Sequence, residues 1–147
     1  MLDIFTPEYF MKEALKEAQN AFNQGEVPVG AVIVSNNTII ARTHNLTEKL
    51  TDVTAHAEMM AITSATEALG GKYLIDCHLY VTLEPCVMCG GALAWSQMGE
   101  VTFGASDSSR GAGRLSENIY HPKTKVQGGV MAQECAQLMT DFFKDKR

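Results

Sequence analysis

Two short stretches of the chain hold side chains whose types and spacing could do chemistry together. The run HAE contains His56 and Glu58, and the run PCVMC places Cys86 and Cys89 at positions i and i+3. Imidazole nitrogen and thiolate sulfur are ligands that zinc prefers, and residues i and i+3 share one face of a helix. Three protein ligands leave the fourth tetrahedral position open to water, which is typical of a catalytic zinc.

The cysteine pair alone is open to two other interpretations. It could be a redox pair, or it could be half of a closed structural zinc clip. The fourth ligand of such a clip could come from Cys77, Cys135, His44, His78 or His121. Neither interpretation has a use for Glu58, whereas a carboxylate beside a metal-activated water is the general base that such a site needs. We therefore interpret His56, Cys86 and Cys89 as zinc ligands and Glu58 as the catalytic residue.

Composition limits the class of protein. The chain has 147 residues, which is the size of one domain, so we expect a single domain over residues 1–147. It has four cysteines, and its start has no basic segment leading into an apolar run, so we expect a cytoplasmic protein. No stretch approaches the ~20 apolar residues that span a bilayer, so we expect no membrane association.

The net charge of −5 excludes a basic surface over the whole chain. Seventeen acidic residues outnumber 12 lysines and arginines. A local basic patch is still compatible with this balance, and Lys123, Lys125 and residues 144–147 are the places to expect one.

The elements that must position the candidate site follow from periodicity and turn residues. Thr6 and Pro7 suit the start of a helix whose apolar stripe continues to Gly25. The remaining elements are a hairpin of strands at 29–34 and 38–42, a helix capped by Thr54 and ended by Gly70, a strand at 78–83, a helix opened by Pro85, a strand at 100–105, a glycine-rich loop at 105–120, a short strand near 124–127 and a last amphipathic helix.

This order indicates an α/β protein with a mixed sheet between two layers of helices. Right-handed crossovers put the two inner helices on one face of the sheet. The helix starts that carry His56 and Cys86 then meet at one end of the sheet. The loop at 105–120 is too long for a tight connection, so we expect it to be functional.

TAHAE and TLEPCVMCGGAL together resemble the zinc-dependent cytidine and deoxycytidylate deaminase superfamily. Further stretches resemble its bacterial tRNA adenosine deaminases: EVPVGAV at 26–32, HN at 44–45, LYVTLEPCVMC at 79–89, FGASD at 103–107, HP at 121–122 and ECAQLMTDFF at 134–143. The resemblance covers nearly the whole chain and implies a three-layer α/β/α cytidine-deaminase-like fold with five strands.

The resemblance also implies a reaction and the residues for it. The reaction is hydrolytic conversion of adenosine to inosine at the wobble position of a tRNA anticodon, by a homodimer with one Zn²⁺ per subunit. His56, Cys86 and Cys89 match the zinc ligands, and Glu58 matches the proton shuttle. The matching substrate contacts are Asn45 for the nucleoside, Val29, Leu83 and the backbone of Ala57 for the base, and Asp107 and His121 for the flanking nucleotides.

The chain departs from these relatives in its RNA-facing charge. The loop LTEKLTDV lacks their basic and proline-rich character, so phosphate contacts fall to Arg110, Arg114, Lys123, Lys125 and residues 144–147. This leaves two alternatives open: a deaminase of free guanine, cytosine or a nucleoside, and a zinc-stabilised binding subunit without catalysis. Trp95 follows PCVMC on the same helix, and we interpret it as a core or dimer contact.

Overall fold

The computed structural model describes residues 3–144 and residue 146. Its elements are α1 (Pro7–Asn23), β1 (Gly30–Ser35), β2 (Thr38–His44), α2 (Ala57–Leu69), β3 (Cys77–Leu83), α3 (Val87–Trp95), β4 (Glu100–Ala105), a 3₁₀ turn (Ala112–Arg114), β5 (Lys125–Gln127) and α4 (Ala132–Lys144). This confirms the predicted order of helices and strands. The structural account of the basic cluster at 144–147 is limited to Lys144 and Lys146, because residues 145 and 147 lie outside the described residues.

The five strands form one mixed sheet in the order β2-β1-β3-β4-β5. Strand β1 is antiparallel to both of its neighbours, whereas β3, β4 and β5 are parallel to one another. The β1–β2 hairpin turns at Asn36 and Asn37. Both residues have positive φ, as the two central residues of a type I′ hairpin turn require. The predicted five-stranded mixed sheet is thus confirmed.

The register brings four strand ends to the same edge of the sheet. Gly30 at the start of β1 pairs with His44 at the end of β2, and Ala31 pairs with Val81 near the end of β3. Leu83 of β3 in turn pairs with Ala105, the last residue of β4. The segments that leave these strands therefore meet in one place, which is where the functional site forms.

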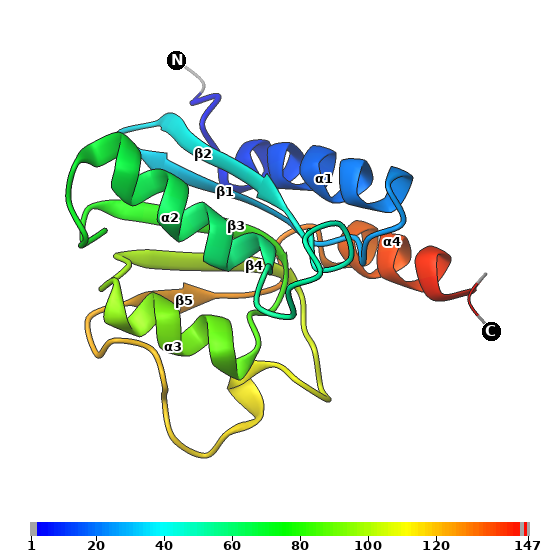
Figure 1. Ribbon diagram of the computed structural model, residues 1–147. Coiled ribbons are helices and arrows are strands. Elements are labelled where there is room, and N and C mark those ends of the chain that lie inside the picture. The colour runs from blue at the N-terminus through cyan, green and yellow to red at the C-terminus, as the bar shows by residue number, and fades with distance from the viewer. Residues whose placement is uncertain (1–2, 145, 147) are drawn as a thin grey trace.

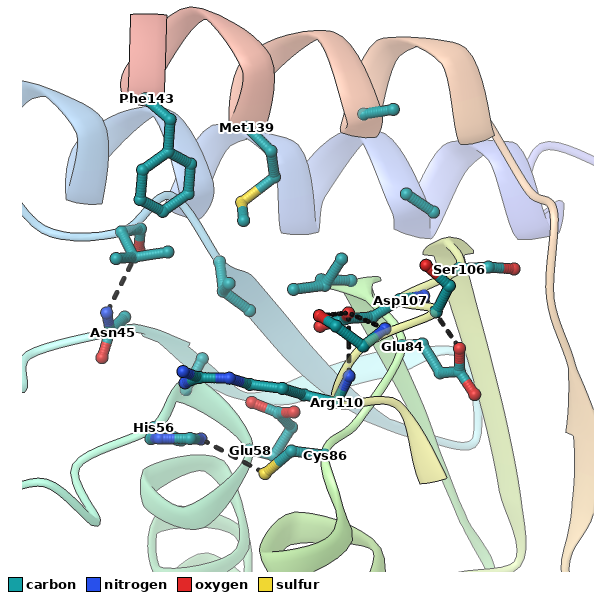
Figure 2. A pocket seen from close by; sticks show the side chains of 18 of the residues that line it. Asn45, His56, Glu58, Glu84, Cys86, Ser106, Asp107, Arg110, Met139 and Phe143 are labelled. Carbon is teal, nitrogen blue, oxygen red and sulfur yellow. Dashed lines mark hydrogen bonds between the residues drawn. The ribbon is translucent and has the colours of Figure 1, made fainter. Parts of the chain in front are cut away.

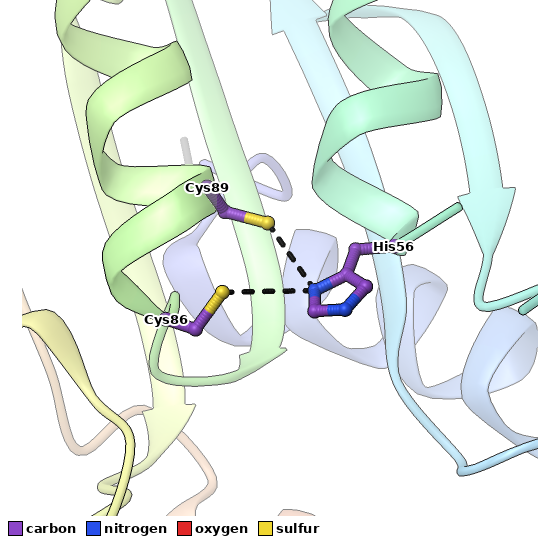
Figure 3. A group of neighbouring side chains, drawn as sticks. All are labelled: His56, Cys86 and Cys89. Carbon is purple, nitrogen blue, oxygen red and sulfur yellow. Dashed lines mark hydrogen bonds between the residues drawn. The ribbon is translucent and has the colours of Figure 1, made fainter. Parts of the chain in front are cut away.

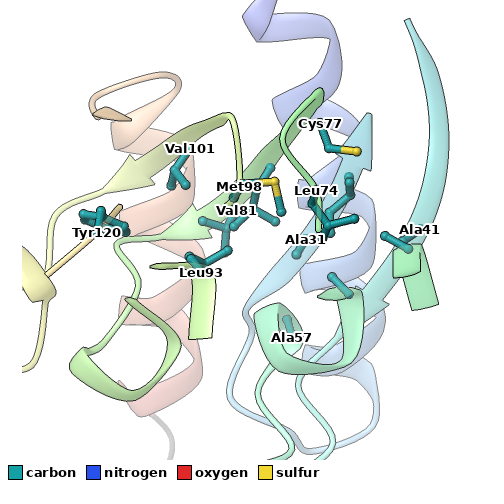
Figure 4. Close-up of a cluster of buried hydrophobic side chains, with 14 of the residues drawn as sticks. Ala31, Ala41, Ala57, Leu74, Cys77, Val81, Leu93, Met98, Val101 and Tyr120 are labelled. Atoms are coloured by element: carbon teal, nitrogen blue, oxygen red, sulfur yellow. The ribbon is translucent and has the colours of Figure 1, made fainter. Parts of the chain in front are cut away.

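Helices cover both faces of the sheet. Figure 1 shows α2 and α3 on one face and α1 and α4 on the other, as the right-handed crossovers predict. The larger core cluster lies on the face of α2 and α3 and includes Leu74, Val81, Leu93 and Val101 (Figure 4). On the other face α1 packs closely on β1. A Cβ at Gly30 would overlap the backbone of α1, so this close approach requires a glycine at position 30.

Two helix starts differ from the prediction. The first inner helix begins at Ala57, with His56 and not Thr54 at the N-cap position, because the Thr54 amide and hydroxyl both donate to Asp52 Oδ1 in a preceding turn. The second begins at Val87, with Cys86 at the N-cap position and Pro85 just outside. His56 and Cys86 therefore leave the chain at the point where each helix starts.

Other single-residue expectations are settled by burial. Cys77 and Cys135 are buried in the core, as predicted, and all four cysteines are free thiols. Trp95 is 86% exposed, so it is not a core residue. Within the described part of the chain, no helix is long and apolar enough to cross a membrane.

Candidate active site

A cavity of about 730 Å³ opens at the sheet edge where the strand ends meet. Its walls come from the segments around β1, the end of β2, the start of α2, the end of β3, the loop after β4 and the last helix (Figure 2). The sequence-predicted residues among its lining are Val29, Asn45, His56, Ala57, Glu58, Leu83, Cys86, Asp107 and Arg110.

His56, Cys86 and Cys89 face one another at the floor of this region. The Nδ1 atom of His56 lies 3.7 Å from Cys86 Sγ and 3.5 Å from Cys89 Sγ (Figure 3). The three ligand atoms all lie within 4.8 Å of one another. The two helix starts therefore present one nitrogen and two sulfurs to a common point.

This spacing fits a tetrahedral zinc ion. With Zn–N of about 2.0–2.1 Å and Zn–S of about 2.3 Å, a tetrahedral angle separates the nitrogen and sulfur ligands by about 3.6 Å. The observed 3.5 and 3.7 Å bracket that separation. Among the described residues, no other histidine, cysteine or acid joins this group, so the donor set matches a site with one open position rather than a closed clip.

Electrostatics also favours metal binding. A hydrogen bond from Cys89 and another from His56 lower the pKa of Cys86 to about 4. The hydrogen bond to Cys86, together with burial, raises the pKa of Cys89. Because thiolate is the form that binds zinc, one ligand is already in its binding form at neutral pH. A redox pair formed by Cys86 and Cys89 alone would give no role to His56, whose Nδ1 lies against both sulfurs.

Glu58 lies behind the metal-facing group and is only 3% exposed. Burial removes its carboxylate from water and raises its pKa to about 7. A carboxyl group with a pKa near neutrality can accept and return a proton with little cost in either direction. The side chain is therefore suited to proton transfer inside the cavity.

The base-binding residues predicted by resemblance line the cavity wall. Val29 and Leu83 contribute apolar surface. The carbonyl of Ala57 accepts a hydrogen bond from Thr43 Oγ1 at 2.6 Å, and its amide lies in the first turn of α2, where amides have no partner inside the helix. These groups give the cavity two apolar side chains and one backbone donor.

Asn45 is 6% exposed and is fixed by its neighbours. Its Nδ2 donates to the Val27 carbonyl at 3.3 Å, and its Oδ1 accepts from the Thr47 amide at 3.2 Å (Figure 2). The side chain thus joins the two segments that form one wall of the cavity.

The two residues predicted to face flanking nucleotides lie in different places. Asp107 lines the cavity, and its Oδ1 accepts hydrogen bonds from the Ser109 amide, the Ser109 hydroxyl and the Arg110 amide at 3.0–3.1 Å. His121 lines a separate hollow near Glu100 at the amino end of β4. The structure therefore does not bring His121 to the cavity.

Sequence reasoning missed two kinds of lining residue. Met139 and Phe143 of α4 form an apolar wall opposite the metal-facing group (Figure 2), although the sequence indicates only an amphipathic helix. Glu84, in the stretch TLEPC, also lines the cavity, and no role is predicted for it from the sequence. Its position between the end of β3 and Cys86 is the feature of the sequence that could have indicated one.

Comparison with known proteins agrees with this geometry. A family model described as the cytidine and deoxycytidylate deaminase zinc-binding region matches residues 5–105. A tRNA-specific adenosine deaminase of Aquifex aeolicus (strain VF5) is 46% identical over 145 residues, 95% of this chain and 95% of the relative. One of Bacillus subtilis (strain 168) is also 46% identical over 145 residues, 95% of this chain and 90% of the relative.

A solved structure is similar as well. It comes from a study of A-to-I editing by tRNA:A34 deaminases at the wobble position of transfer RNA, with a TM-score of 0.83 and 41% identity over 88% of this chain and 98% of that one. The match to the zinc-binding region contains His56, Cys86 and Cys89, the group that could hold one zinc ion. The chain therefore belongs to the zinc-dependent cytidine and deoxycytidylate deaminase family, in the branch of the tRNA-specific adenosine deaminases.

Proposed function

We propose that this protein deaminates adenosine to inosine at the wobble position of a tRNA anticodon. The observation that carries the proposal is an open group of His56, Cys86 and Cys89 beside the buried, protonatable Glu58 in a substrate-sized cavity. The names of relatives that are 46% identical over 95% of the chain supply the substrate. A structural binding subunit would not need a buried carboxyl group with a pKa near 7.

The reaction adds water to C6 of the purine and releases ammonia. Zinc, when held by His56, Cys86 and Cys89, makes a water molecule acidic enough to act as a nucleophile at neutral pH. Glu58 accepts the proton of the attacking water and delivers it to the ring nitrogen next to C6. It then carries the second proton to the departing amino group, so that adenosine and water become inosine and ammonia.

The cavity walls hold the base for this transfer. Val29 and Leu83 flank the purine, the Ala57 amide donates to it, and Asn45 hydrogen-bonds the nucleoside while its own contacts keep it in place. Met139 and Phe143 extend the apolar surface beyond the base. An anticodon loop suits such a site because its bases are already unpaired, so that extruding one costs little. In this proposal Asp107, which lines the cavity, contacts a flanking nucleotide, whereas His121, which lines a separate hollow, does not.

We also propose that the protein is a homodimer. Helix α3 has no charged residue, and its solvent side presents Val87, Met88 and Trp95, which are 38%, 37% and 86% exposed. A helix that is apolar on all sides is normally buried, and a second copy of the chain would bury this one. Sedimentation of the wild type and of Trp95→Asp tests this, with a dimer and a monomer as the expected results.

The four free cysteines support a cytoplasmic location, because thiols persist in a reducing compartment. Fractionation of cells that express the chain at native levels would test this expectation.

One assay tests the proposed reaction. The zinc-loaded protein is incubated with an anticodon stem-loop that has adenosine at the wobble position, and in parallel with free guanine, cytosine, cytidine and adenosine. We expect inosine in the stem-loop and no ammonia from the free bases or nucleosides. Stem-loops with the adenosine moved by one position serve as the specificity control. Turnover of guanine or cytosine without any change in the RNA would overturn the proposal.

A further inference from the structure

Glu84 joins two points of the loop that follows β4, at Asp107 and Gly113. Its Oε1 accepts a hydrogen bond from the Asp107 amide at 2.9 Å, and its Oε2 accepts one from the Gly113 amide at 2.8 Å. One carboxylate thus fixes the two ends of the 107–113 segment. Hydrogen bonds to a charged acceptor are stronger than neutral ones, so this side chain is a strong restraint on the loop.

The loop backbone packs directly against this carboxylate. A Cβ placed on Gly113 would lie 2.6 Å from Glu84 Oε2 and close to no other residue's side chain or backbone. The same stretch is tied to the metal-facing segment, because the Ala112 amide donates to the Pro85 carbonyl at 2.8 Å and Gly111 forms a β-bridge with Cys86. Glu84 and Gly113 therefore form a complementary pair within a seam beside Cys86.

The restrained loop carries Arg110 to the mouth of the cavity. Figure 2 shows the Arg110 side chain reaching across the cavity in the direction of His56. Among the described residues Arg110 forms no ion pair, although other arginine and lysine side chains do. Its guanidinium is thus available to an anionic ligand at this point.

We propose that Glu84 is a positioning residue that fixes the 107–113 loop so that Arg110 stays over the cavity mouth, where it binds a backbone phosphate of the RNA substrate. This inference rests on the proposed function for the identity of the anion. Glu84 itself touches neither the base nor the reacting atoms. Its loss frees two amides and the loop, which weakens substrate binding and leaves the proton transfer by Glu58 in place.

The first test compares Glu84→Ala with Glu117→Ala, an exposed acid in the neighbouring segment. Zinc content, amide hydrogen exchange at Asp107 and Gly113, and the kinetics on the anticodon stem-loop are measured for each. For Glu84→Ala we expect full zinc content, faster exchange at both amides and a KM raised about tenfold, which is the loss of one modest contact. We expect kcat to stay within about threefold, whereas Glu117→Ala changes nothing.

The second test asks whether Glu84 acts through Arg110. Arg110→Ala should raise KM to a similar degree and lower the slope of log KM against log salt by about 1, the signature of one phosphate contact. Because both changes remove the same contact, the double variant should resemble either single variant. Additive effects would overturn the proposal, as would loss of zinc in Glu84→Ala.

The third test uses the contact between Gly113 and Glu84. Gly113→Ala forces the carboxylate away and should raise KM and speed amide exchange in the wild-type background, but should do neither once Glu84 is alanine. These exchange measurements need no RNA. If the wild type leaves the stem-loop unchanged, the proposed function fails, whereas unchanged exchange in Glu84→Ala overturns the role of Glu84 whatever the RNA assay shows.

Discussion

Two glutamates are buried in the described part of this molecule, and they are buried in different ways. Glu26 is 1% exposed, and its two oxygens accept hydrogen bonds from the Glu48 and Lys49 amides at 2.9 and 2.8 Å. Glu58 is 3% exposed and has its pKa raised to about 7 by burial. The first carboxylate is held by amides and shapes a loop, whereas the second is left able to exchange its proton.

The surroundings of a buried acid decide its use. Two backbone amides donate to the two oxygens of Glu26, so that its burial leaves neither oxygen without a partner. Glu58 sits beside the metal-facing sulfurs, where its charged form is opposed by burial and by the Cys86 thiolate. Replacement of each acid by its neutral isostere should therefore separate a loss of stability from a loss of activity.

Catalysis should change most when Glu58 is replaced. Glu58→Gln keeps the shape of the side chain but cannot accept the proton of the attacking water, so kcat should fall about 10³–10⁴-fold. Zinc content should be unchanged, and the free energy of unfolding should stay the same or rise, because an unfavourably buried acid has been removed. Inosine formation, metal analysis and urea unfolding measure the three quantities. Loss of zinc would show that Glu58 is a ligand.

The next effect is on stability. Glu26→Gln replaces one acceptor oxygen by an amide group that faces a backbone amide, and it removes the charge that strengthens both bonds. The free energy of unfolding should fall by about 3 kcal/mol, while kcat of the folded enzyme stays within about twofold. Glu48→Gln, in the same loop but with an exposed side chain, is the matched control. A kcat loss as deep as that of Glu58→Gln would erase the contrast between the two acids.

The sequence predicts one of these glutamates and not the other, for a physical reason. Glu58 can be predicted from the sequence because it lies two residues after His56, at the start of the same helix. Glu26 and Glu84 look like solvated acids, because their amide partners lie 22 to 29 positions away. Only the meeting of strand ends brings those amides to them, and periodicity carries no record of such a contact.

The same limit explains the other differences from prediction. Strands, helices and their order follow from local patterns, and all were predicted. Thr54 satisfies its own turn instead of capping a helix, because Asp52 competes for its hydroxyl. Phe143 lines the cavity because α4 packs beside β4, which a helical stripe alone cannot indicate.

A third residue should combine the two effects at a smaller size. Asn45 bridges Val27 and Thr47 and also faces the cavity, so Asn45→Ala leaves the Val27 carbonyl and the Thr47 amide without their partner. We expect the free energy of unfolding to fall by about 1 kcal/mol and kcat/KM to fall about tenfold. Asn45→Asp keeps the acceptor for Thr47 but places a carboxylate oxygen against the Val27 carbonyl, so the free energy of unfolding should fall further than in Asn45→Ala. An unchanged kcat/KM in Asn45→Ala would mean that Asn45 has no substrate contact.

The smallest effect is expected at a basic side chain, His78. It tests whether burial shifts the pKa of His78 as it shifts the pKa of Glu58. At the far end of β3, His78 Nε2 lies 2.7 Å from Thr102 Oγ1, and its Nδ1 lies 3.4 Å from Glu100 Oε2. Burial lowers the pKa of His78 below its ordinary 6.5, and the Glu100 charge partly offsets this. The folded state therefore binds this proton less readily than the unfolded state, so the contribution to stability is complete above pH 6.5 and is lost as the pH falls through the lowered pKa.

Urea unfolding of the wild type at a series of pH values should show this loss, and His78→Gln, which cannot titrate, should lack it. Glu100→Gln should deepen the loss, because it removes the charge that favours the protonated ring. If the loss on acidification were the same in His78→Gln, other groups would be responsible. Burial would then explain the difference between Glu26 and Glu58 but would not explain the pH dependence of stability that we assign to His78.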